Sequence, residues 1–270
     1  MEEKIRADVA LVRRGLTASR ERAQSLIASG LVTLNGKLLE KPSVKVTASE
    51  ILAVRGTEHP YVSRGGLKLE KALQCFHVNP LGQVCMDIGA STGGFTDVLL
   101  QNGARRVYAI DVGHSQLDPR LAEDPRVTNM EHVNARALTV NMFPEAPSLA
   151  VMDVSFISIR LILPAALSVL GAQGRLISLI KPQFEAGKAH IGKHGVISNP
   201  SIHADVLKTI VDFAPTLGWH VHALDFSPIA GTQGNLEFLA DFQPGICPEI
   251  PISDSEIECL VRRAHDALSL

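Results

Sequence analysis

Short apolar runs alternate with helical segments through most of the chain, from residue 84 to residue 242. The runs are bounded by glycine, proline or polar turns, which is typical of buried strands. They are VCMDIG (84–89), RVYAIDVG (106–113), RVTNMEHV (126–133), LAVMDVSF (149–156), RLISLI (175–180), WHVHALDF (219–226) and LEFLADF (236–242). Strands that alternate with helices in this way predict a doubly wound, mainly parallel α/β sheet of five to seven strands.

The front of the chain follows a different pattern. Apolar residues have helical spacing over residues 4–16, and a second short helix follows with Thr17 or Ser19 as its N-cap. The dipeptide Asn35-Gly36 then lies between two strand-like stretches, which is a strong signal for a hairpin. We therefore expect a small α+β module over residues 1–56, with only a modest core of its own.

Residues 57–66 are polar and contain Pro60, Gly65 and Gly66, so we expect a linker there and a larger domain over residues 67–270. Charge is divided unevenly along the chain. Residues 1–70 hold 12 of the 26 lysines and arginines but 8 of the 28 acidic residues, so the front end is basic and the remainder is acidic. A basic front end favours an anionic partner.

RNA is the partner that we expect for the basic module. Only 4% of residues are aromatic, so recognition of phosphates and shape is favoured over base stacking. For any one of these side chains, an ordinary solvated surface charge is an equal alternative. The residues expected to contact RNA are Arg6, Arg13, Arg14, Arg20, Arg22, Lys37 and Lys41.

Several function classes lack their signals. The first residues show no basic segment followed by an apolar core, and the longest apolar run, Leu161–Ala172, is too short to cross a bilayer and contains Pro164. The four cysteines have no metal-type spacing. We therefore expect a cytoplasmic protein with no membrane partner and no metal.

The first strand leads into a glycine-rich turn, DIGASTGGFTDVLL (87–100), which bears on the cofactor. Neither the G-x-G-x-x-G nor the G-x-x-x-x-G-K-[ST] phosphate motif is present. Asp87 beside the turn would repel a diphosphate but suits a cation, while Asp111 is placed to grip a ribose and Asn134 to read an adenine edge. This ordered set favours S-adenosylmethionine, with another nucleotide ligand as the alternative.

Charged residues recur where later strands end. Asp153 and Lys181 each follow an apolar run and Glu237 interrupts one, which points either to a structural salt-bridge network or to a site beyond the strand ends. Transfer of a methyl group to a ribose hydroxyl fits this set. A lysine serves as the base only if desolvation or a second cation lowers its pKa, because neighbouring carboxylates raise it.

The sequence resembles, over nearly its whole length, the TlyA family of ribosomal RNA 2′-O-methyltransferases, whose catalytic body is FtsJ-like. The resemblance rests on an N-terminal segment similar to the small RNA-binding domain of ribosomal protein S-four, and on five motifs in order. Those motifs are YVSRGGLKLEKAL, DIGASTGGFTD, MDVSFIS, LIKPQFE and GNLEF. The fold that it implies is a Rossmann-like sheet of seven strands, typical of adenosylmethionine-dependent methyltransferases, behind the α+β RNA-binding domain.

The resemblance also assigns roles to individual residues. Its catalytic tetrad falls on Lys68, Asp153, Lys181 and Glu237, with Lys181 as the base or the residue that positions the 2′-oxygen. Cofactor contacts are implied for Asp87, Gly89, Ala90, Ser91, Gly93, Gly94, Phe95, Asp111, Asn134 and Asp153.

The implied substrates are cytidine 2′-hydroxyls of 16S and 23S rRNA within 30S and 50S subunits, and not DNA. Two alternatives stay open at this point: a non-enzymatic RNA-binding or ribosome-assembly factor, and a haemolysin-like protein. The oligomeric state, the nucleotide and the choice of subunit are not indicated by the sequence.

Overall fold

The computed structural model describes residues 4–17, 19–28, 30–54, 59–187, 190–192, 195–231, 233–245 and 251–268. It divides the chain into two compact units, residues 1–60 and residues 61–270. Each unit has its own hydrophobic core. Within the described residues, no helix is both long enough and apolar enough to cross a membrane.

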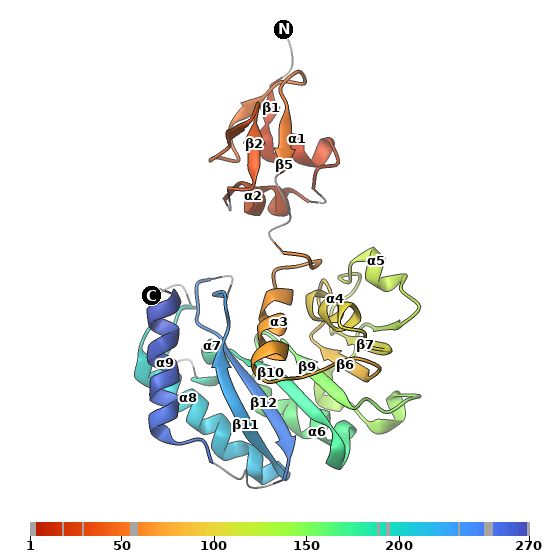
Figure 1. The fold of residues 1–270 in the computed structure, drawn as a ribbon, viewed down its shortest axis with the longest axis vertical. Coiled ribbons are helices and arrows are strands. Elements are labelled where there is room, and N and C mark those ends of the chain that lie inside the picture. Colours follow the sequence, from red (N-terminus) through yellow and green to blue (C-terminus); the bar gives the residue numbers. More distant parts are fainter. Residues whose placement is uncertain are drawn as a thin grey trace. The chain divides into compact units, whose positions relative to one another are not determined.

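The first unit packs two short helices against small antiparallel sheets (Figure 1). One sheet pairs β1 with β4, and the other has the order β3-β2-β5. The elements are β1 (Ile5–Arg6), α1 (Ala7–Arg13), α2 (Arg20–Ala28), β2 (Val32–Leu34), β3 (Lys37–Leu38), β4 (Lys45–Val46) and β5 (Leu52–Val54).

Local signals in this unit are largely confirmed. Ser19, rather than Thr17, caps the second helix, because its Oγ accepts a hydrogen bond from Arg22 N at 3.2 Å. The Asn35-Gly36 hairpin is present, and both residues have positive φ. The first helix is shorter than its apolar spacing indicates, since residues 5 and 6 pair with β4 instead.

The second unit is built on the seven-stranded sheet that the apolar runs predict. Its order is β11-β12-β10-β9-β6-β7-β8, and β12 runs in the direction opposite to that of the other six strands. The strands are β6 (Val84–Ile88), β7 (Arg106–Ile110), β8 (Val127–Met130), β9 (Leu149–Met152), β10 (Arg175–Ile180), β11 (Trp219–Phe226) and β12 (Phe238–Pro244). Because helices cover both faces, the central strands are largely apolar, and all five residues of β6 are buried, Asp87 among them.

Helices lie on both faces of this sheet (Figure 1). One face packs against α3 and α4, and the other against α6, α8 and α9. The helices are α3 (Gly66–Cys75), α4 (Gly94–Gln101), α5 (Pro119–Ala122), α6 (Leu163–Leu170), α7 (Pro182–Glu185), α8 (Pro200–Phe213) and α9 (Asp254–Leu268). The short 3₁₀ turns are η1 (Ala135–Ala137), η2 (Val140–Met142), η3 (Ile159–Leu161), η4 (Gly171–Gln173) and η7 (Ala214–Leu217).

Part of the segment that we expected to be a linker packs on the second unit. Tyr61 is buried and its hydroxyl donates to Glu70 on α3, while Val62 N donates to Asp97 on α4 at 2.8 Å. Residues 57 and 58 of that segment lie outside the described residues. Residues 61–65 therefore run directly into α3 as a fixed part of the larger unit.

Candidate active site

The functional residues gather at the carboxyl edge of the parallel strands, where register places them side by side. Ile88 is paired with both Ile110 and Met152, so the residues that follow these three leave the sheet at the same level. Those residues are Gly89, Asp111 and Asp153. The edge of an open α/β sheet where parallel strands end is where ligands bind.

The antiparallel strand β12 completes this edge from the opposite direction. Its first residue, Phe238, pairs with Ile180, the last residue of β10. Glu237 therefore precedes β12 at the same edge where Lys181 follows β10. A carboxylate and a lysine that are 56 positions apart in sequence are brought together by strand direction alone.

Four charged side chains form one connected cluster here. Lys181 Nζ lies 2.6 Å from Asp153 Oδ1, and Lys68 Nζ, from α3, donates to Glu237 Oε2 at 2.5 Å. Lys68 Nζ also lies 3.9 Å from Asp153 Oδ2, which links the two pairs. The contact between Lys181 and Asp153 is an ion pair without hydrogen-bond alignment, whereas Lys181 does donate to Ser155 Oγ at 2.9 Å.

Burial makes this cluster interdependent. The side chains of Lys68, Glu237 and Lys181 are 9%, 4% and 10% exposed, so each ion has lost most of its hydration. Two ammonium groups and two carboxylates balance in charge, but removal of one partner leaves a buried ion uncompensated. A Cβ at Gly231 would lie 2.6 Å from Glu237 Oε1, so glycine lets the backbone approach this carboxylate.

The glycine-rich turn passes directly over the end of β9. Gly89 has a φ of +86°, and a Cβ there would lie 2.5 Å from the carbonyl oxygen of Asp153. A Cβ at Gly94, the first residue of α4, would overlap Ser63 Oγ. Both glycines therefore allow close approaches that any other residue would block.

A pocket of about 540 Å³ opens beside this turn, within the size range of small-molecule sites. Its lining includes Gly89, Ser91, Asp111, Asn134 and Asp153. A smaller hollow of about 180 Å³ shares Gly89, Ser91 and Asp153 with it and reaches Ser63, Gly65, Ala90, Gly94, Phe95 and Lys181. The two hollows together run from Asn134 to the ammonium group of Lys181.

A second hollow of similar size lies elsewhere. About 570 Å³ in volume, it lies at the opposite edge of the sheet, beside Trp219 and Pro244, and no ionisable side chain lines it. Size does not separate the two, but chemistry favours the pocket beside the glycine turn, because Asp111 and Asp153 line it and the adjoining smaller hollow reaches Lys181. We take the pocket beside the glycine turn as the site.

The residues expected to grip a nucleoside lie on the wall of the pocket. Asp111 accepts hydrogen bonds from Ser91 N at 2.8 Å and Gly113 N at 2.7 Å, one on each carboxylate oxygen. Each oxygen retains acceptor capacity for a ribose hydroxyl. Asn134 Oδ1 accepts from Arg136 N as the cap of η1, which leaves its amide N–H₂ as the group that can donate to a base.

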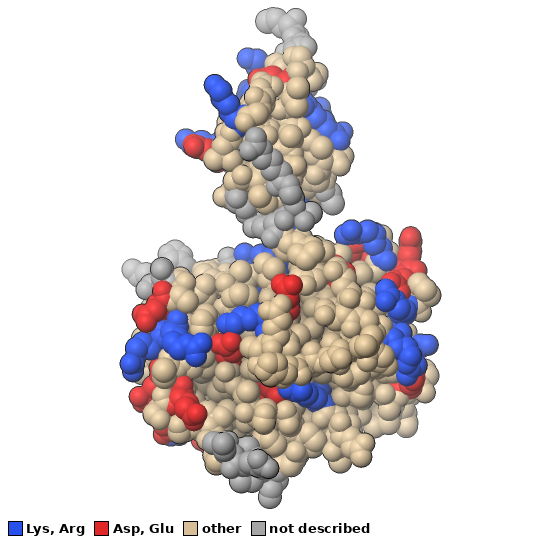
Figure 2. Space-filling model, viewed as in Figure 1, with Lys and Arg blue, Asp and Glu red and all other residues tan. Residues whose placement is uncertain are grey.

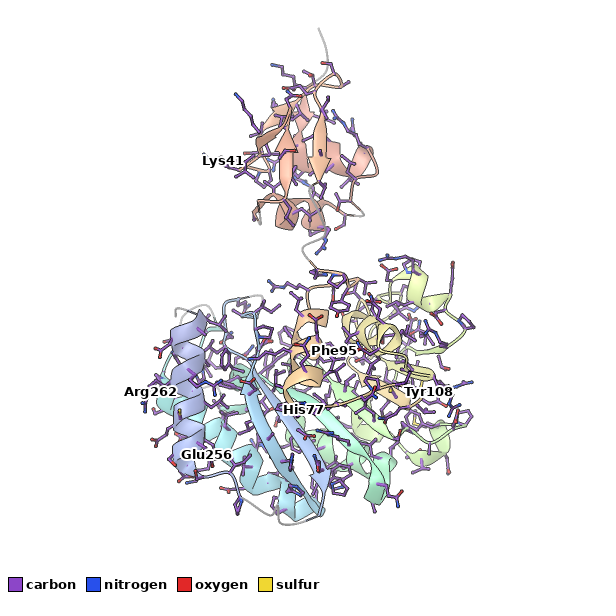
Figure 3. All side chains as sticks on the ribbon, viewed as in Figure 1. Lys41, His77, Phe95, Tyr108, Glu256 and Arg262 are labelled. Atoms are coloured by element: carbon purple, nitrogen blue, oxygen red, sulfur yellow. The ribbon has the colours of Figure 1, made fainter. Side chains whose placement is uncertain are left out.

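Two residues of the expected cofactor set do not line either hollow. Asp87 is fully buried in β6 and accepts a hydrogen bond from Thr96 Oγ1 at 2.7 Å, so it lies behind the turn. Burial raises the pKa of Asp87 to about 7, and the nearby Asp153 and Asp111 carboxylates add to the rise. Gly93, with a φ of +94°, packs against Leu117 and Leu121. Phe95, on α4, is buried in the core beside α3 and is among the residues that line the smaller hollow (Figure 3).

Some residues at the site were not singled out by sequence reasoning. Ser155 lies in the MDVSF motif and contacts Lys181, and Ser63 comes from the expected linker. Phe156 is 91% exposed at the rim of the 540 Å³ pocket and has a φ of +64°. The centroid of its ring lies 5.2 Å from that of Phe184. An exposed aromatic ring held in the left-handed region is unusual, and neither property has a signal in the sequence.

Glu131 braces the two loops that form one wall of the pocket. Its carboxylate accepts from Ser115 N at 2.8 Å and contacts His114 Nδ1 at 2.7 Å. His132 stacks on His114 with ring centroids 5.0 Å apart. Among the described residues, this trio is the group spaced as metal ligands would be, although the sequence indicated no metal.

In the first unit, the expected RNA-binding residues differ in their surroundings. Arg14 donates to the carbonyl oxygens of Glu50 and Thr47, so its guanidinium holds the unit together from within. Arg22 contacts His59, and Arg6 and Arg20 share a carboxylate. Arg13, Lys37 and Lys41 are exposed, and Lys41 projects from the edge of the unit (Figure 3). Basic side chains surface on both flanks of the unit in this view (Figure 2).

Comparison with known proteins adds to this geometry. Residues 61–243 match the FtsJ-like methyltransferase family, and residues 5–52 match the S4 domain. The chain is 46% identical over 269 residues to YqxC of Bacillus subtilis, which is named provisionally as an rRNA methyltransferase, with 98% of this chain and 96% of that protein covered.

Two further relatives are similar over most of their length. The 16S/23S rRNA (cytidine-2′-O)-methyltransferase TlyA of Mycobacterium tuberculosis is 42% identical over 239 residues, which cover 88% of this chain and 89% of that protein. A solved structure from Streptococcus thermophilus, described provisionally as a haemolysin, is 45% identical, has a TM-score of 0.80 and covers 100% of this chain and 98% of its own. The chain therefore belongs to the FtsJ-like methyltransferases and, within them, to the TlyA family, whose members join this body to an N-terminal S4 domain.

Proposed function

We propose that the protein transfers a methyl group from S-adenosylmethionine to the 2′-hydroxyl of a ribose, in a cytidine, of rRNA within 30S or 50S subunits. The observation that carries the proposal is the buried cluster of Lys68, Asp153, Lys181 and Glu237 at the end of the cofactor-sized pocket. The rRNA methyltransferase named TlyA supports the choice of acceptor. A cytoplasmic location, where ribosomal subunits are available, belongs to the same proposal.

The pocket has the properties that S-adenosylmethionine requires. Gly89 lets the turn pass close over the Asp153 backbone at the pocket wall, Asp111 offers acceptors for a ribose, and Asp153 offers a carboxylate near the junction of the two hollows. No lysine or arginine of a phosphate-binding loop is present in the turn, which suits a ligand without phosphates. When bound, this cofactor supplies an activated methyl group on a cationic sulfur.

Lys181 is the residue that meets the acceptor oxygen. Its Nζ donates one hydrogen bond, to Ser155 Oγ at 2.9 Å, and pairs with Asp153 Oδ1 at 2.6 Å without hydrogen-bond alignment. Hydrogen-bonding capacity of Nζ therefore remains for the 2′-oxygen of the substrate. Lys181 thus positions this oxygen. As the neutral amine it takes the hydroxyl proton while the carbon–oxygen bond forms and the carbon–sulfur bond of the cofactor breaks, in the manner of a general base; as the ammonium it only positions the oxygen.

Lys68 and Glu237 act on the same site from the other side. Lys68 brings a second ammonium group within 3.9 Å of Asp153, and Glu237 holds it there. Asp153 is therefore shared between two lysines and fixes both. Asp153 is thus not the partner of Lys181 alone. Through Asp153, Lys68 and Glu237 also act on the position of Lys181.

The experiment is methyl transfer from tritiated S-adenosylmethionine to purified 30S and 50S subunits, followed by mapping of 2′-O-methyl positions in the rRNA. We expect Lys181→Ala to lose about 10²-fold or more of the rate, the range attributed to general acid–base catalysis. Lys68→Met is expected to lose activity as well, because it leaves Glu237 as an unpaired buried carboxylate.

Lys71→Met provides the matched control. Lys71 lies one turn from Lys68 on α3 and pairs with Asp225 at 3.2 Å, outside both hollows. It should retain its rate. Equal incorporation by the wild type and Lys181→Ala would remove Lys181 from catalysis. Cofactor and subunit binding without incorporation by the wild type would instead support an RNA-binding or assembly factor.

A further inference from the structure

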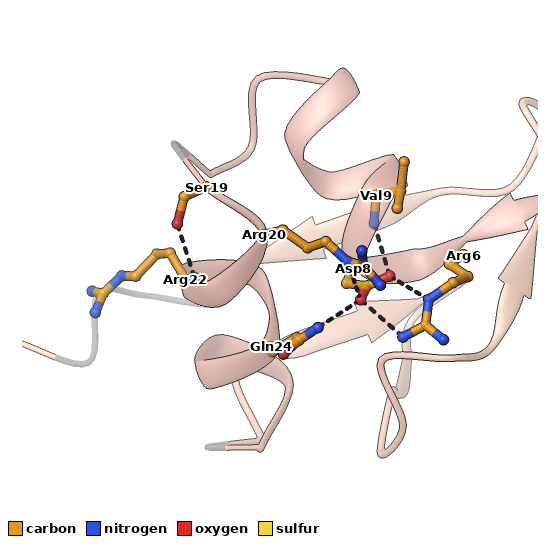
Figure 4. A network of polar contacts seen from close by, with 7 residues as sticks. All are labelled: Arg6, Asp8, Val9, Ser19, Arg20, Arg22 and Gln24. Atoms are coloured by element: carbon orange, nitrogen blue, oxygen red, sulfur yellow. Dashed lines mark hydrogen bonds and ion pairs between the residues drawn. The ribbon is translucent and has the colours of Figure 1, made fainter. Parts of the chain in front are cut away.

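Asp8, in the first turn of α1, is fully buried, yet both of its oxygens are bound to arginines that reach the surface (Figure 4). Arg6 donates from Nε to Oδ1 at 3.0 Å and from Nη2 to Oδ2 at 2.9 Å. Arg20, at the start of α2, donates from Nε to Oδ2 at 3.0 Å. Gln24 and Val9 N add two further hydrogen bonds, at 2.8 and 3.0 Å. These donors lower the pKa of Asp8, with Arg6 as the largest cause, so the carboxylate is charged at neutral pH.

The two arginines keep part of their hydrogen-bonding capacity free. The side chains of Arg6 and Arg20 are 41% and 54% exposed. A guanidinium carries five N–H groups. Among the described residues, Arg20 uses Nε alone and Arg6 uses Nε and Nη2, so Nη1 and Nη2 of Arg20 and Nη1 of Arg6 make no hydrogen bond.

We propose that Asp8 is a positioning residue for RNA, which holds Arg6 and Arg20 together as one clamp for a backbone phosphate. The proposal rests on the proposed function. It assigns a role in RNA binding to an acidic residue within a basic unit. A guanidinium that is fixed before binding loses less conformational freedom when a phosphate arrives. Free arginines at the same positions would have to be ordered by the RNA itself.

The clamp and the net charge predict opposite effects of Asp8→Asn on RNA affinity. Two guanidiniums and one carboxylate leave one net positive charge, and Asp8→Asn raises it to two. If only charge mattered, the variant would bind RNA more tightly and with a steeper dependence on salt. If position matters, the variant binds more weakly although it is more positive. A purely structural role for Asp8 would change thermal stability but would not reverse the effect of charge on affinity.

The test measures binding of the full-length protein to a fluorescein-labelled RNA hairpin by anisotropy, over a range of salt concentrations and without methyl donor. Three variants are compared with the wild type: Asp8→Asn, Arg20→Lys and Arg13→Lys. Arg20→Lys keeps the charge but loses the planar fork that spans Asp8 and a phosphate. Arg13 is exposed on the same unit and has no contact with Asp8, so Arg13→Lys is the matched control.

We expect Asp8→Asn and Arg20→Lys each to weaken binding by about 3- to 10-fold and to lower the salt slope by about one, as loss of one phosphate contact does. Arg13→Lys keeps its charge and has no carboxylate that holds its guanidinium in place, so it should lose less affinity than Arg20→Lys. Folded Asp8→Asn protein that binds as tightly as the wild type, or more tightly, would overturn the clamp.

If Asp8→Asn does not fold, Arg20→Lys decides the matter, and equal affinities for Arg20→Lys and Arg13→Lys overturn the proposal. Wild-type protein that binds no RNA overturns it as well. Wild-type protein that binds RNA but methylates no subunit contradicts the proposed function and leaves the clamp intact, so the two failures are distinguishable.

Discussion

Asp87 has one carboxylate oxygen, Oδ1, that is buried and accepts no hydrogen bond within the described residues, while Oδ2 accepts from Thr96. Burial raises its pKa to about 7 from an ordinary value of 3.8. The folded protein therefore holds this proton more tightly than the unfolded chain does. It follows that the contribution of Asp87 to stability is fully present below about pH 4 and is lost as pH rises from about 4 to about 7. Replacement by asparagine, which cannot ionise, tests this directly.

The size of the effect follows from the shift. Each pKa unit corresponds to 1.36 kcal/mol, so a shift of roughly three units costs the wild type about 4 kcal/mol by pH 8. In Asp87→Asn the carbonyl oxygen keeps the Thr96 bond, but the amide N–H₂ takes the place of the unpaired Oδ1 and costs about 1–3 kcal/mol at every pH. The variant should be less stable than the wild type near pH 4 and more stable by about 1–3 kcal/mol at pH 8.

Urea unfolding followed by tryptophan fluorescence measures the free energy of unfolding of the second unit, which contains Asp87. Trp219 is the one tryptophan of the chain, lies in the second unit and is 5% exposed. Asp241→Asn is the matched control, because Asp241 is equally buried but accepts two hydrogen bonds from Arg175 at 2.8 Å. That variant should be less stable at pH 4 and at pH 8. A stability difference between Asp87→Asn and wild type that does not change with pH would refute the reasoning.

Three further outcomes are expected. His203 on α8 is fully buried against His265, and burial lowers its pKa to about 4. Its contribution to stability is therefore lost as pH falls from about 6.5 to about 4, and His203→Gln should remove about 3 kcal/mol of that loss in the same urea assay. Gly89→Ala should abolish cofactor binding in calorimetry, whereas Gly218→Ala, which has a similar φ of +74° and open space, should cost only backbone strain. Phe156→Ala should raise KM for subunits several-fold and leave thermal stability and cofactor affinity unchanged, since its ring is 91% exposed.

Much of the site could be predicted from the sequence because parallel strands end at one edge. Each apolar run marks a buried strand, and the polar residue that follows it is delivered to the ligand-binding edge. Asp111, Asp153 and Lys181 are all of this kind. The strands that lead to Asp153 and Lys181 are neighbours, and β6 separates them from the strand that leads to Asp111. Whether each residue performs its expected role stays a prediction.

Other parts of the site depend on contacts that no run of residues encodes. Lys68 lies on a helix 169 positions from Glu237, and only the family resemblance paired them. Arg14 looks like any surface arginine in the sequence, yet its guanidinium reaches carbonyl oxygens 33 and 36 residues away. Phe156 owes its exposure to a left-handed backbone at a loop. Such features follow from tertiary structure, so periodicity and spacing do not predict them.

The direction of β12 decides whether the cluster exists at all. Glu237 comes before its strand, whereas Asp153 and Lys181 follow theirs, so a parallel β12 would place Glu237 at the far edge of the sheet. Lys68 would then be buried with Asp153 at 3.9 Å as its one carboxylate partner among the described residues. The antiparallel direction of β12 therefore places the Glu237 carboxylate where it compensates the buried ammonium group of Lys68. It also joins α3, which directly follows residues 61–65, to the strand beside Lys181. The cluster thus holds α3 against the sheet while it presents Lys181 to the pocket, so loss of any one of its four charges should affect both folding of this edge and catalysis.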